Sequence, residues 1–203
     1  MKELVQKQLA QSIATMQAVL ADPHIADTIV SIGDLTAKAM KSGKKLLVAG
    51  NGGSAADAQH LVAEFVVRLN VNRPALRAIA LTTDSSILTA TGNDFGFDHV
   101  FERQIEALGQ PGDVFLGIST SGNSTNIIKA LEQAHKMGIT TIGFSGNGGG
   151  KMRCLCSYNV VIPSAVTMNI QESHLALEHI FCMVVERCMF GNDFESHPQI
   201  LSE

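Results

Sequence analysis

Short apolar runs alternate along this chain with longer segments whose apolar residues recur every three or four positions. The apolar runs span residues 45–49, 77–81, 114–118, 140–144 and 159–162. Helical patterns separate the first four runs and follow the last. Short continuous apolar strands joined by helical crossovers are typical of a parallel sheet covered on both faces. The pattern therefore predicts an α/β protein with a doubly wound parallel sheet.

The 42 residues before the first run have a helical pattern of their own, with a break predicted around Asp22 and Pro23 and a second helix over 25–40. Apolar residues in the first part recur at helical spacing: Leu4, Val5, Leu9, Ile13, Met16, Val19 and Leu20. A helix before the first strand has little sheet of its own to cover. Its apolar stripe fits packing within the chain or contact with another subunit equally well.

Composition narrows the class of protein. The chain has 203 residues, of which 45% are hydrophobic, and no long Pro- or Ser-rich linker, so one domain is expected. The net charge of -4 and the lack of a Lys/Arg cluster argue against direct binding to nucleic acid. No apolar run approaches the roughly 20 residues that span a bilayer, and the N-terminus lacks the apolar core of a signal peptide. A cytoplasmic protein that makes no membrane contact is predicted.

The cysteines give no sign of a thiolate metal site. None of the four forms a Cys-x-x-Cys pair: Cys154, Cys156, Cys182 and Cys188. Buried, reduced thiols without disulfides are the expectation.

Two serine-bearing loops, Gly50–Ser54 and Ser119–Ser124, each lie between an apolar run and a helical segment. A helix start offers unpaired N–H groups and partial positive charge, Gly lets the backbone approach an anion, and hydroxyls add donors. The first loop lacks the Lys-[Ser/Thr] ending of a P-loop and the Gly-x-Gly-x-x-Gly of a dinucleotide site. The two loops together predict a site for a smaller phosphorylated ligand, such as a sugar phosphate, at the carboxyl ends of the strands.

The helix after the first loop, for which Ser54 is the expected N-cap, carries His60, Glu64 and Arg68 at i, i+4 and i+8. Neighbours at this spacing share a helix face and could bind a metal or form an acid/base couple. An ordinary exposed helix face carries such pairs often, so the spacing alone favours neither interpretation.

The last helix places Gln171 and His179 two turns apart and adds a neighbouring i, i+4 pair, His174 and Glu178. Polar residues in so apolar a helix are costly unless they are satisfied. For His174 a hydrogen-bonded histidine at a helix-packing interface is the preferred interpretation.

Two Gly-containing stretches are less specific. Residues 91–97 are interpreted as a turn with an Asx-type turn or helix cap at Asn93 and Asp94. Residues 145–150 are interpreted as a flexible connection rather than another anion contact.

These motifs occur in one order along the chain: Gly50-Asn51-Gly52-Gly53-Ser54, His60-x3-Glu64, Gly92-Asn93-Asp94, Ser119-Thr120-Ser121-Gly122-Asn123-Ser124, and Ile170-Gln171-Glu172 with His179. In this combination the chain resembles the sugar isomerase (SIS) domain family, most closely its bacterial phosphoheptose isomerase branch. The resemblance runs to about Gly191, so one SIS domain over 1–191, including the helical segment 1–42, and a C-terminal tail over 192–203 are expected.

The resemblance implies a five-stranded parallel sheet, a homotetramer and one Zn²⁺ per subunit. It implies conversion of sedoheptulose 7-phosphate to D-glycero-D-manno-heptose 7-phosphate, an early step toward the heptose of lipopolysaccharide. Metal ligands carried over by position are His60, Glu64, Gln171 and His179. Phosphate ligands are Ser119, Thr120, Ser121 and Ser124. Other substrate contacts are Asn51, Gly52, Gly53, Ser54, Glu64, Arg68, Asn93, Asp94 and Gln171.

Aldose–ketose conversion needs one group to remove a proton beside the carbonyl and another to help reprotonate the enediol. Glu64 is the expected base and His179 the expected acid. A side chain held tightly by Zn²⁺ is a poor proton carrier, so the two residues cannot be permanent ligands and free acid/base groups at once. Either the substrate displaces ligands, or the metal mainly stabilises the site and polarises oxygens.

The chain also departs from the family pattern. Met168 stands where some relatives have an acidic residue, and Asn169 where an Arg is common, so any proton transfer or charge contact from that turn is missing here. Two alternatives remain: an isomerase of another phosphosugar, or a non-catalytic SIS scaffold that binds a replication initiator. The retained polar residues disfavour the scaffold. A sugar-phosphate sensor fused to a DNA-binding module does not fit in 203 residues.

Overall fold

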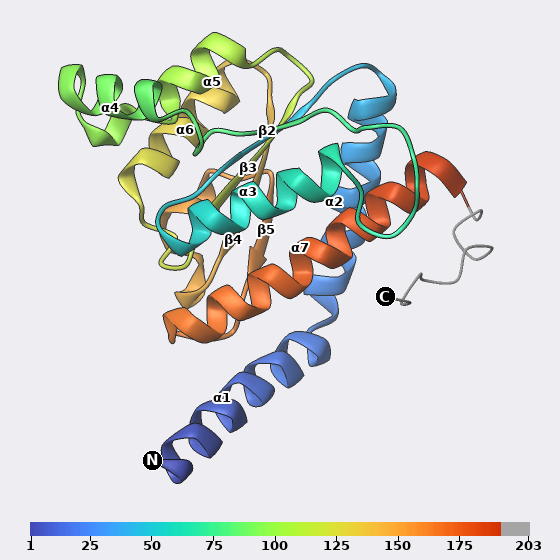
Figure 1. Cartoon of the computed structure of the whole chain (residues 1–203), viewed down its shortest axis with the longest axis vertical. Coiled ribbons are helices and arrows are strands. Elements are labelled where there is room, and N and C mark those ends of the chain that lie inside the picture. Colours follow the sequence, from blue (N-terminus) through green and yellow to red (C-terminus); the bar gives the residue numbers. More distant parts are fainter. Residues whose placement is uncertain (192–203) are drawn as a thin grey trace.

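The fold is a single parallel sheet with helices on both faces (Figure 1). The computed structural model describes residues 1–191, and the tail predicted over 192–203 lies outside the described residues. The strands are β1 (Leu46–Ala49), β2 (Ala78–Ala80), β3 (Val114–Ser119), β4 (Thr140–Ser145) and β5 (Tyr158–Val161). Their order is β2-β1-β3-β4-β5, and every neighbouring pair is parallel. This confirms the predicted doubly wound, five-stranded sheet.

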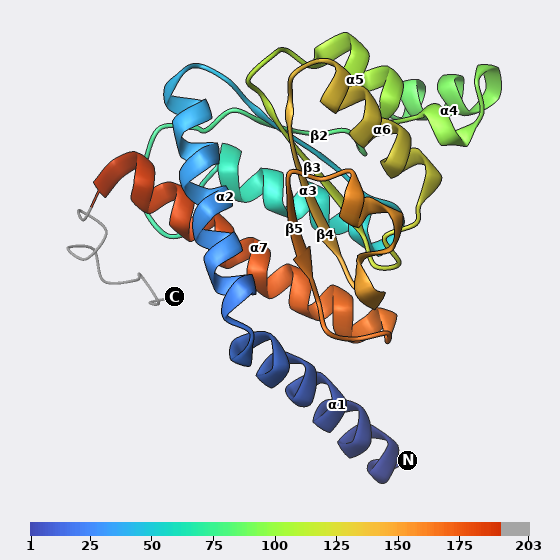
Figure 2. The ribbon, with the colours of Figure 1, turned by 180° about the vertical axis from the view of Figure 1, so that it is seen from behind.

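Two sets of helices cover the two faces of the sheet (Figures 1 and 2). One set is α2 (Pro23–Lys41), α3 (Gly53–Val66) and α7 (Thr167–Phe190). The other is α4 (Ser85–Asp94), α5 (Glu102–Leu108) and α6 (Thr125–Lys136), with the short 3-10 segments η1 (Phe97–His99) and η2 (Asn147–Cys154). None of the described helices is long and apolar enough to cross a membrane.

Successive side chains of β1 are buried alternately on the two faces of the sheet, which explains why the strands are apolar throughout. Leu46 and Val48 belong to the buried cluster under α2, α3 and α7. Leu47 and Ala49 belong to the cluster under α5 and α6. Because successive side chains of a strand point to opposite faces, a strand covered on both faces must be apolar at every position.

Helix α1 (Lys2–Ala21) leaves the body of the protein as a separate arm (Figure 1). The break before α2 falls where it was predicted: the Asp22 side chain accepts a hydrogen bond from the His24 N–H at 2.9 Å, and Pro23 opens the helix. Gln8 attaches the arm to α7, because its Nε2 donates to Asn169 Oδ1 at 2.9 Å. Asn169, the position where an Arg was expected, is thus buried and holds α1.

Two expectations about local structure were wrong. Residues 91–94 are the last turn of helix α4 rather than a free turn. The capping residue of that helix is Asp84 at its start, which accepts from the Ile87 N–H at 2.9 Å. The four cysteines are free as expected, but only Cys182 is buried, and Cys154 is exposed.

His174 packs in the core between α7 and the sheet, as predicted. Its Nε2 lies 3.1 Å from the Ser145 carbonyl oxygen, to which it donates, and its ring lies against Phe144. Burial lowers the pKa of His174 from 6.5 to about 4, and the bond to Ser145 offsets only part of this effect.

His174 should therefore favour unfolding on mild acidification, and replacing it isolates this contribution from that of other buried groups. The unfolded chain takes up a proton at His174 near its ordinary pKa, whereas the folded chain does so only near pH 4, so stability is lost as the pH falls below the unfolded value. The free energy of unfolding should be about 2 kcal/mol lower at pH 5 than at pH 7 from this residue alone. Urea unfolding at both pH values should show that going from pH 7 to pH 5 is about 2 kcal/mol less unfavourable for His174→Gln than for the wild type. The exposed His135→Gln serves as the control, and an equal pH dependence in all three proteins would contradict the assignment.

Candidate active site

The two serine loops lie side by side because β1 and β3, which they follow, are neighbours in the sheet. Asn51 Nδ2 donates to Asn126 Oδ1, and Asn126 Nδ2 donates back to Asn51 Oδ1, both at 2.9 Å. Strand order reverses between these strands, the position where doubly wound sheets bind ligands. Sequence reasoning missed Asn126; its only signal was an amide in the first turn of the helix after the serine loop.

The loop Ser119–Ser124 gathers hydroxyl groups at the start of α6. Ser119 Oγ lies 2.8 Å from Ser124 Oγ and 3.4 Å from Ser121 Oγ. Ser124 is the N-cap residue of α6, but its side chain makes no capping bond, so its hydroxyl remains available to a ligand. Hydroxyl donors beside the positive end of a helix are what a phosphate group requires.

A glycine contact supports this loop from behind. Gly122 has a φ of +65°, and a Cβ there would overlap the Gly149 carbonyl group. The Met152 N–H donates to the Gly122 carbonyl oxygen at 3.0 Å. The Gly-rich segment of η2 thus supports the loop, and that it makes no anion contact of its own stays a prediction.

The first serine loop is built differently from the prediction. Helix α3 begins at Gly53, and its N-cap is Gly52 with a φ of 56°. Ser54 is therefore not the helix cap that was expected; it lies within the first turn and is buried. Gly53 packs against the Gln171 amide of α7, where a Cβ would overlap that amide, so α3 and α7 meet at this point.

Three predicted ligands converge between α3 and α7. His60 Nε2 lies 2.8 Å from His179 Nε2 and 3.5 Å from Glu64 Oε1. Ligand atoms of all three residues lie within 4.8 Å of one another. The side chains are 44% exposed for His60 and 18% exposed for Glu64, so the cluster is open on one side.

The chemistry of this donor set fits a zinc ion. Two imidazole nitrogens and a carboxylate oxygen are the ligand types that Zn²⁺ prefers, and three protein ligands leave a position for substrate oxygen. A proton on one Nε2 lets it donate to the other, and when both Nε2 atoms are unprotonated a cation bound between them removes the repulsion of the facing lone pairs. The residues present therefore fit the metal.

Gln171, the fourth predicted ligand, is occupied elsewhere. Its Nε2 donates to Asp57 Oδ2 at 3.1 Å. Burial raises the pKa of Asp57, although the bond from Gln171 and the His60 ring oppose the rise. Gln171 thus lies in the interface between α3 and α7, and its role as a metal ligand stays a prediction.

Glu178 is the site neighbour that sequence reasoning left without a role. It is fully buried, and neither carboxylate oxygen has a hydrogen-bond partner within the described part of the chain. Burial, reinforced by Asp57, raises the pKa of Glu178 to about 8. The group is therefore largely protonated at neutral pH, next to His179 in the chain.

The remaining predicted contacts lie farther from this cluster. Helix α3 ends at Val66, so Arg68 is exposed beyond the helix and not on the predicted three-residue stripe. Asn93 Nδ2 donates to Asp94 Oδ1 at 2.7 Å on the last turn of α4. Figure 1 places α4 at one extremity of the molecule. The role of these residues in substrate binding stays a prediction.

Comparison with known proteins identifies the family of this chain. Residues 9–146 match the family described as SIS domain. The chain belongs to the SIS domain family. It is 49% identical to the phosphoheptose isomerase of Aneurinibacillus thermoaerophilus, over 97% of this chain and 99% of that protein. It is 51% identical to the phosphoheptose isomerase of Burkholderia pseudomallei (strain 1710b), over 90% and 93% of the two chains.

A solved SIS-domain structure gives the same result. The phosphoheptose isomerase of Neisseria gonorrhoeae superposes with a TM-score of 0.86 at 41% sequence identity, over 91% of this chain and 98% of that chain. The resemblance inferred from the motifs is confirmed at the level of sequence and of fold.

The Gly122 contact generates a prediction for the phosphate loop. Gly122→Ala should lower stability and raise KM for a phosphorylated substrate, because the positive φ and the overlap with Gly149 both oppose a side chain. Gly43→Ala is the matched control: its φ is +76°, but nothing lies within 4 Å of the added Cβ. Gly43→Ala should cost about 1 kcal/mol from backbone strain alone and leave KM unchanged. Equal KM values in the two variants would mean that the loop does not bind phosphate.

Proposed function

We propose that this protein is an aldose–ketose isomerase that converts sedoheptulose 7-phosphate to D-glycero-D-manno-heptose 7-phosphate. The supporting observation is that relatives of about half-identical sequence, aligned over nearly the whole chain, are phosphoheptose isomerases. The convergence of His60, Glu64 and His179 beside two phosphate-type loops supports the same activity.

The proposed chemistry assigns two proton transfers to two residues on facing helices. Glu64 on α3 removes the proton beside the substrate carbonyl, and His179 on α7 exchanges a proton with the opposite end of the enediol. His60, Glu64 and His179, with Gln171 as a further candidate, would hold Zn²⁺, which when bound polarises substrate oxygens. Glu64 acts as a base when its carboxylate is free to take the proton.

The serine loop fixes the other end of the substrate. Ser119, Ser121 and Ser124 bring hydroxyl groups together at the start of α6, and Thr120 follows in the same loop. Asn51 is held by Asn126 at the neighbouring loop, on the side toward α3. A phosphorylated sugar bound by the hydroxyls would extend its carbonyl end toward Glu64.

The exposed Met168 and buried Asn169 give no charged or titratable group at the first turn of α7. A heptose phosphate and a hexose phosphate differ in length, and this turn offers no charge with which to separate them. Turnover of sedoheptulose 7-phosphate compared with fructose 6-phosphate distinguishes the two isomerase hypotheses. A purified protein that binds no zinc and isomerises neither sugar would favour the scaffold alternative.

Removal of the proposed base should abolish turnover. Glu64→Gln keeps the shape of the side chain but cannot accept the proton, so kcat on sedoheptulose 7-phosphate should fall by about 10²–10⁴-fold. Glu132→Gln, an exposed carboxylate on α6, is the control and should retain wild-type kcat. Circular dichroism verifies that both variants are folded, and near-normal turnover by folded Glu64→Gln would disprove the assignment.

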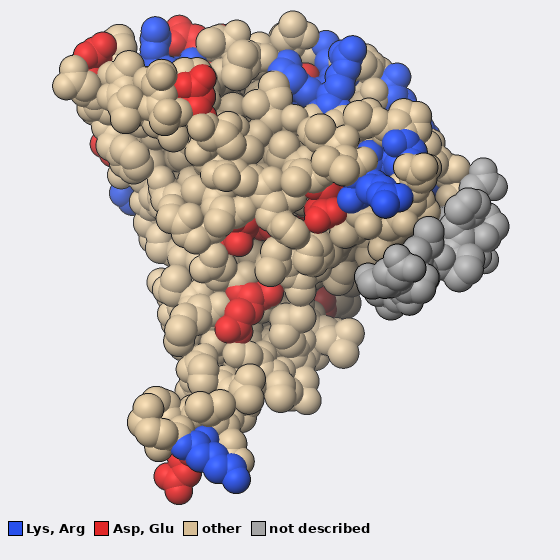
Figure 3. Space-filling view, in the orientation of Figure 1, with Lys and Arg blue, Asp and Glu red and all other residues tan. Residues whose placement is uncertain are grey.

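The proposal includes a homotetramer in which α1 packs on other copies of this chain. The arm exposes large apolar side chains, with Leu9 and Ile13 each 58% and Leu20 88% exposed. Leu175, Ile180 and Met183 continue an exposed apolar surface along α7, to which Gln8 attaches the arm. Figure 3 shows that, apart from its charged tip, the visible side of the arm carries few charged side chains. Exposed apolar side chains in such number are typical of a subunit interface.

A charge on the apolar side of α1 should dissociate this assembly. Ile13→Glu buries an unpaired carboxylate at the proposed interface and should shift the sedimentation coefficient from that of a tetramer to smaller species. Gln11→Glu adds the same charge two residues away, on the opposite side of the helix, and should leave the assembly intact. A wild-type monomer, or a tetrameric Ile13→Glu variant, would rule out this interface.

A further inference from the structure

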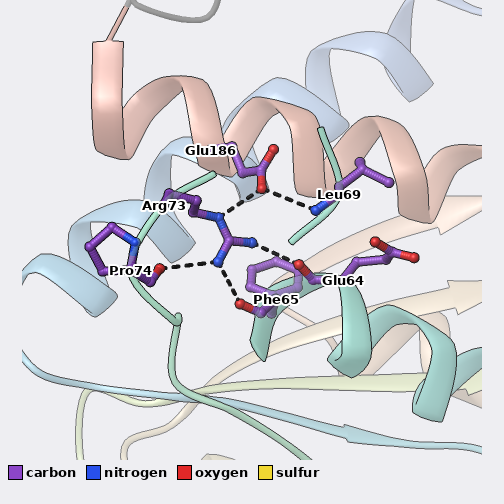
Figure 4. Close-up of polar contacts among 6 residues, drawn as sticks. All are labelled: Glu64, Phe65, Leu69, Arg73, Pro74 and Glu186. Carbon is purple, nitrogen blue, oxygen red and sulfur yellow. Dashed lines mark hydrogen bonds and ion pairs between the residues drawn. The ribbon is translucent and has the colours of Figure 1, made fainter. Parts of the chain in front are cut away.

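A buried arginine connects the helix of the proposed base to the helix of the proposed acid (Figure 4). Arg73 lies in the segment between α3 and β2, and its side chain is 2% exposed. Its Nε donates to Glu186 Oε1 of α7 at 2.7 Å, and the Glu186 side chain is 0% exposed. The Leu69 N–H donates to the same carboxylate oxygen at 3.4 Å. The pair thus anchors both α7 and the chain segment that follows α3.

The other guanidinium nitrogens bind the end of α3 itself. Nη2 donates to the Glu64 carbonyl oxygen at 2.7 Å, and Nη1 donates to the Phe65 carbonyl oxygen at 2.8 Å. These carbonyls belong to the last turn of α3, where helical acceptors lack partners within the helix and favour a cation. One side chain therefore binds the backbone of the proposed base and the neighbouring helix at the same time.

Glu186 is well placed to transmit this restraint to His179. The two residues are seven positions apart on α7, which is two helical turns and nearly the same face. On the same two helices, the rings of Phe65 and Phe181 pack against each other with centroids 5.6 Å apart. The end of α3 and the middle of α7 therefore form one buried contact around the guanidinium.

We propose that Arg73 and Glu186 are positioning residues for the Glu64–His179 site, an inference that rests on the proposed function of that site. The Arg73 guanidinium, which binds in the manner of a fork, fixes the last turn of α3 against α7. The Glu64 carboxylate and the His179 imidazole are thereby held at the distance that a shared zinc ion and substrate need. Neither residue contacts substrate. Lysine cannot replace the fork, because one ammonium group cannot reach both carbonyls and the carboxylate in fixed directions.

The test compares Arg73→Lys with the wild type in two measurements. Zinc affinity is measured by titrating the folded apo-protein with Zn²⁺ against a chromophoric chelator, and kcat and KM are measured on sedoheptulose 7-phosphate. Loss of a residue that orients metal ligands typically lowers metal affinity or activity by about 10–100-fold. Arg73→Lys should show such a fall in zinc affinity and in kcat, with KM within about threefold of the wild type, because the phosphate loop is untouched.

Asp113→Asn is the matched control for lost stability. Asp113 is equally buried, and its Oδ2 pairs with Lys45 Nζ at 2.6 Å. This pair precedes β1 and β3 and therefore lies at the edge of the sheet opposite the site. Asp113→Asn should lower the midpoint of thermal unfolding but leave zinc affinity and kcat close to wild type. If Arg73→Lys had the same zinc affinity and kcat as Asp113→Asn, the role of Arg73 would be purely structural and the inference would be overturned.

Glu186 supplies a second test should Arg73→Lys fail to fold. Glu186→Gln keeps an acceptor for Arg73 Nε and the Leu69 N–H, whereas Glu186→Ala removes it. If Glu186 is a positioning residue, Glu186→Ala should lose zinc affinity and kcat, and Glu186→Gln should retain most of both. Equal values in these two variants would overturn the proposal. Turnover by Glu64→Gln would disprove only the assignment of Glu64 as the base. The proposal for Arg73 would still be tested by the zinc titration. A wild type that neither binds zinc nor turns over would overturn both proposals.

Discussion

The contact between α3 and α7 is the constraint on which the site depends. These helices are separated by a hundred residues of chain, and the loop glycine of one lies directly on the amide of the other at Gly53 and Gln171. The same interface holds the Phe65–Phe181 ring pair and ends at the Arg73–Glu186 ion pair. Each of the three proposed zinc ligands belongs to one of these two helices, so their spacing is set by how the helices pack.

The sheet supplies the second half of the site through its strand order. Because β1 and β3 are neighbours, the loops that follow them end at the same edge, and the reciprocal amide pair of Asn51 and Asn126 keeps them together. The phosphate loop then lies at the start of α6, on the opposite face of the sheet from α3. In the proposed function, a substrate that reaches from one loop to the other would cross the sheet edge, with its phosphate at the hydroxyls and its carbonyl near Glu64.

The sequence pattern was sufficient to predict the strands and the first helix break, because both depend on residues close together in the chain. Apolar runs located all five strands to within a residue or two, and Asp22-Pro23 marked the helix break, because burial on both faces and capping leave direct traces in sequence. Ser54 was misassigned because a glycine with positive φ replaced the expected side-chain cap. Asn126, Arg73 and Glu186 were missed because their partners are 75 or more residues away or are backbone carbonyls, and neither kind of contact has a sequence period.

The buried ion pair also resolves an electrostatic difficulty at the site. Two imidazoles and a carboxylate approach favourably only when a cation or an imidazole proton lies between them, so contacts elsewhere in the fold help to hold the two helices at this distance. Arg73 places its charge behind Glu64, on the carbonyl side of the helix, where it stabilises the last turn without occupying the ligand side. Breaking such a buried pair typically costs about 3–5 kcal/mol, which is comparable to a large part of a domain's stability. The contacts of Arg73 thus hold the end of α3 from its carbonyl side and leave the side of the helix that carries the proposed ligands unobstructed.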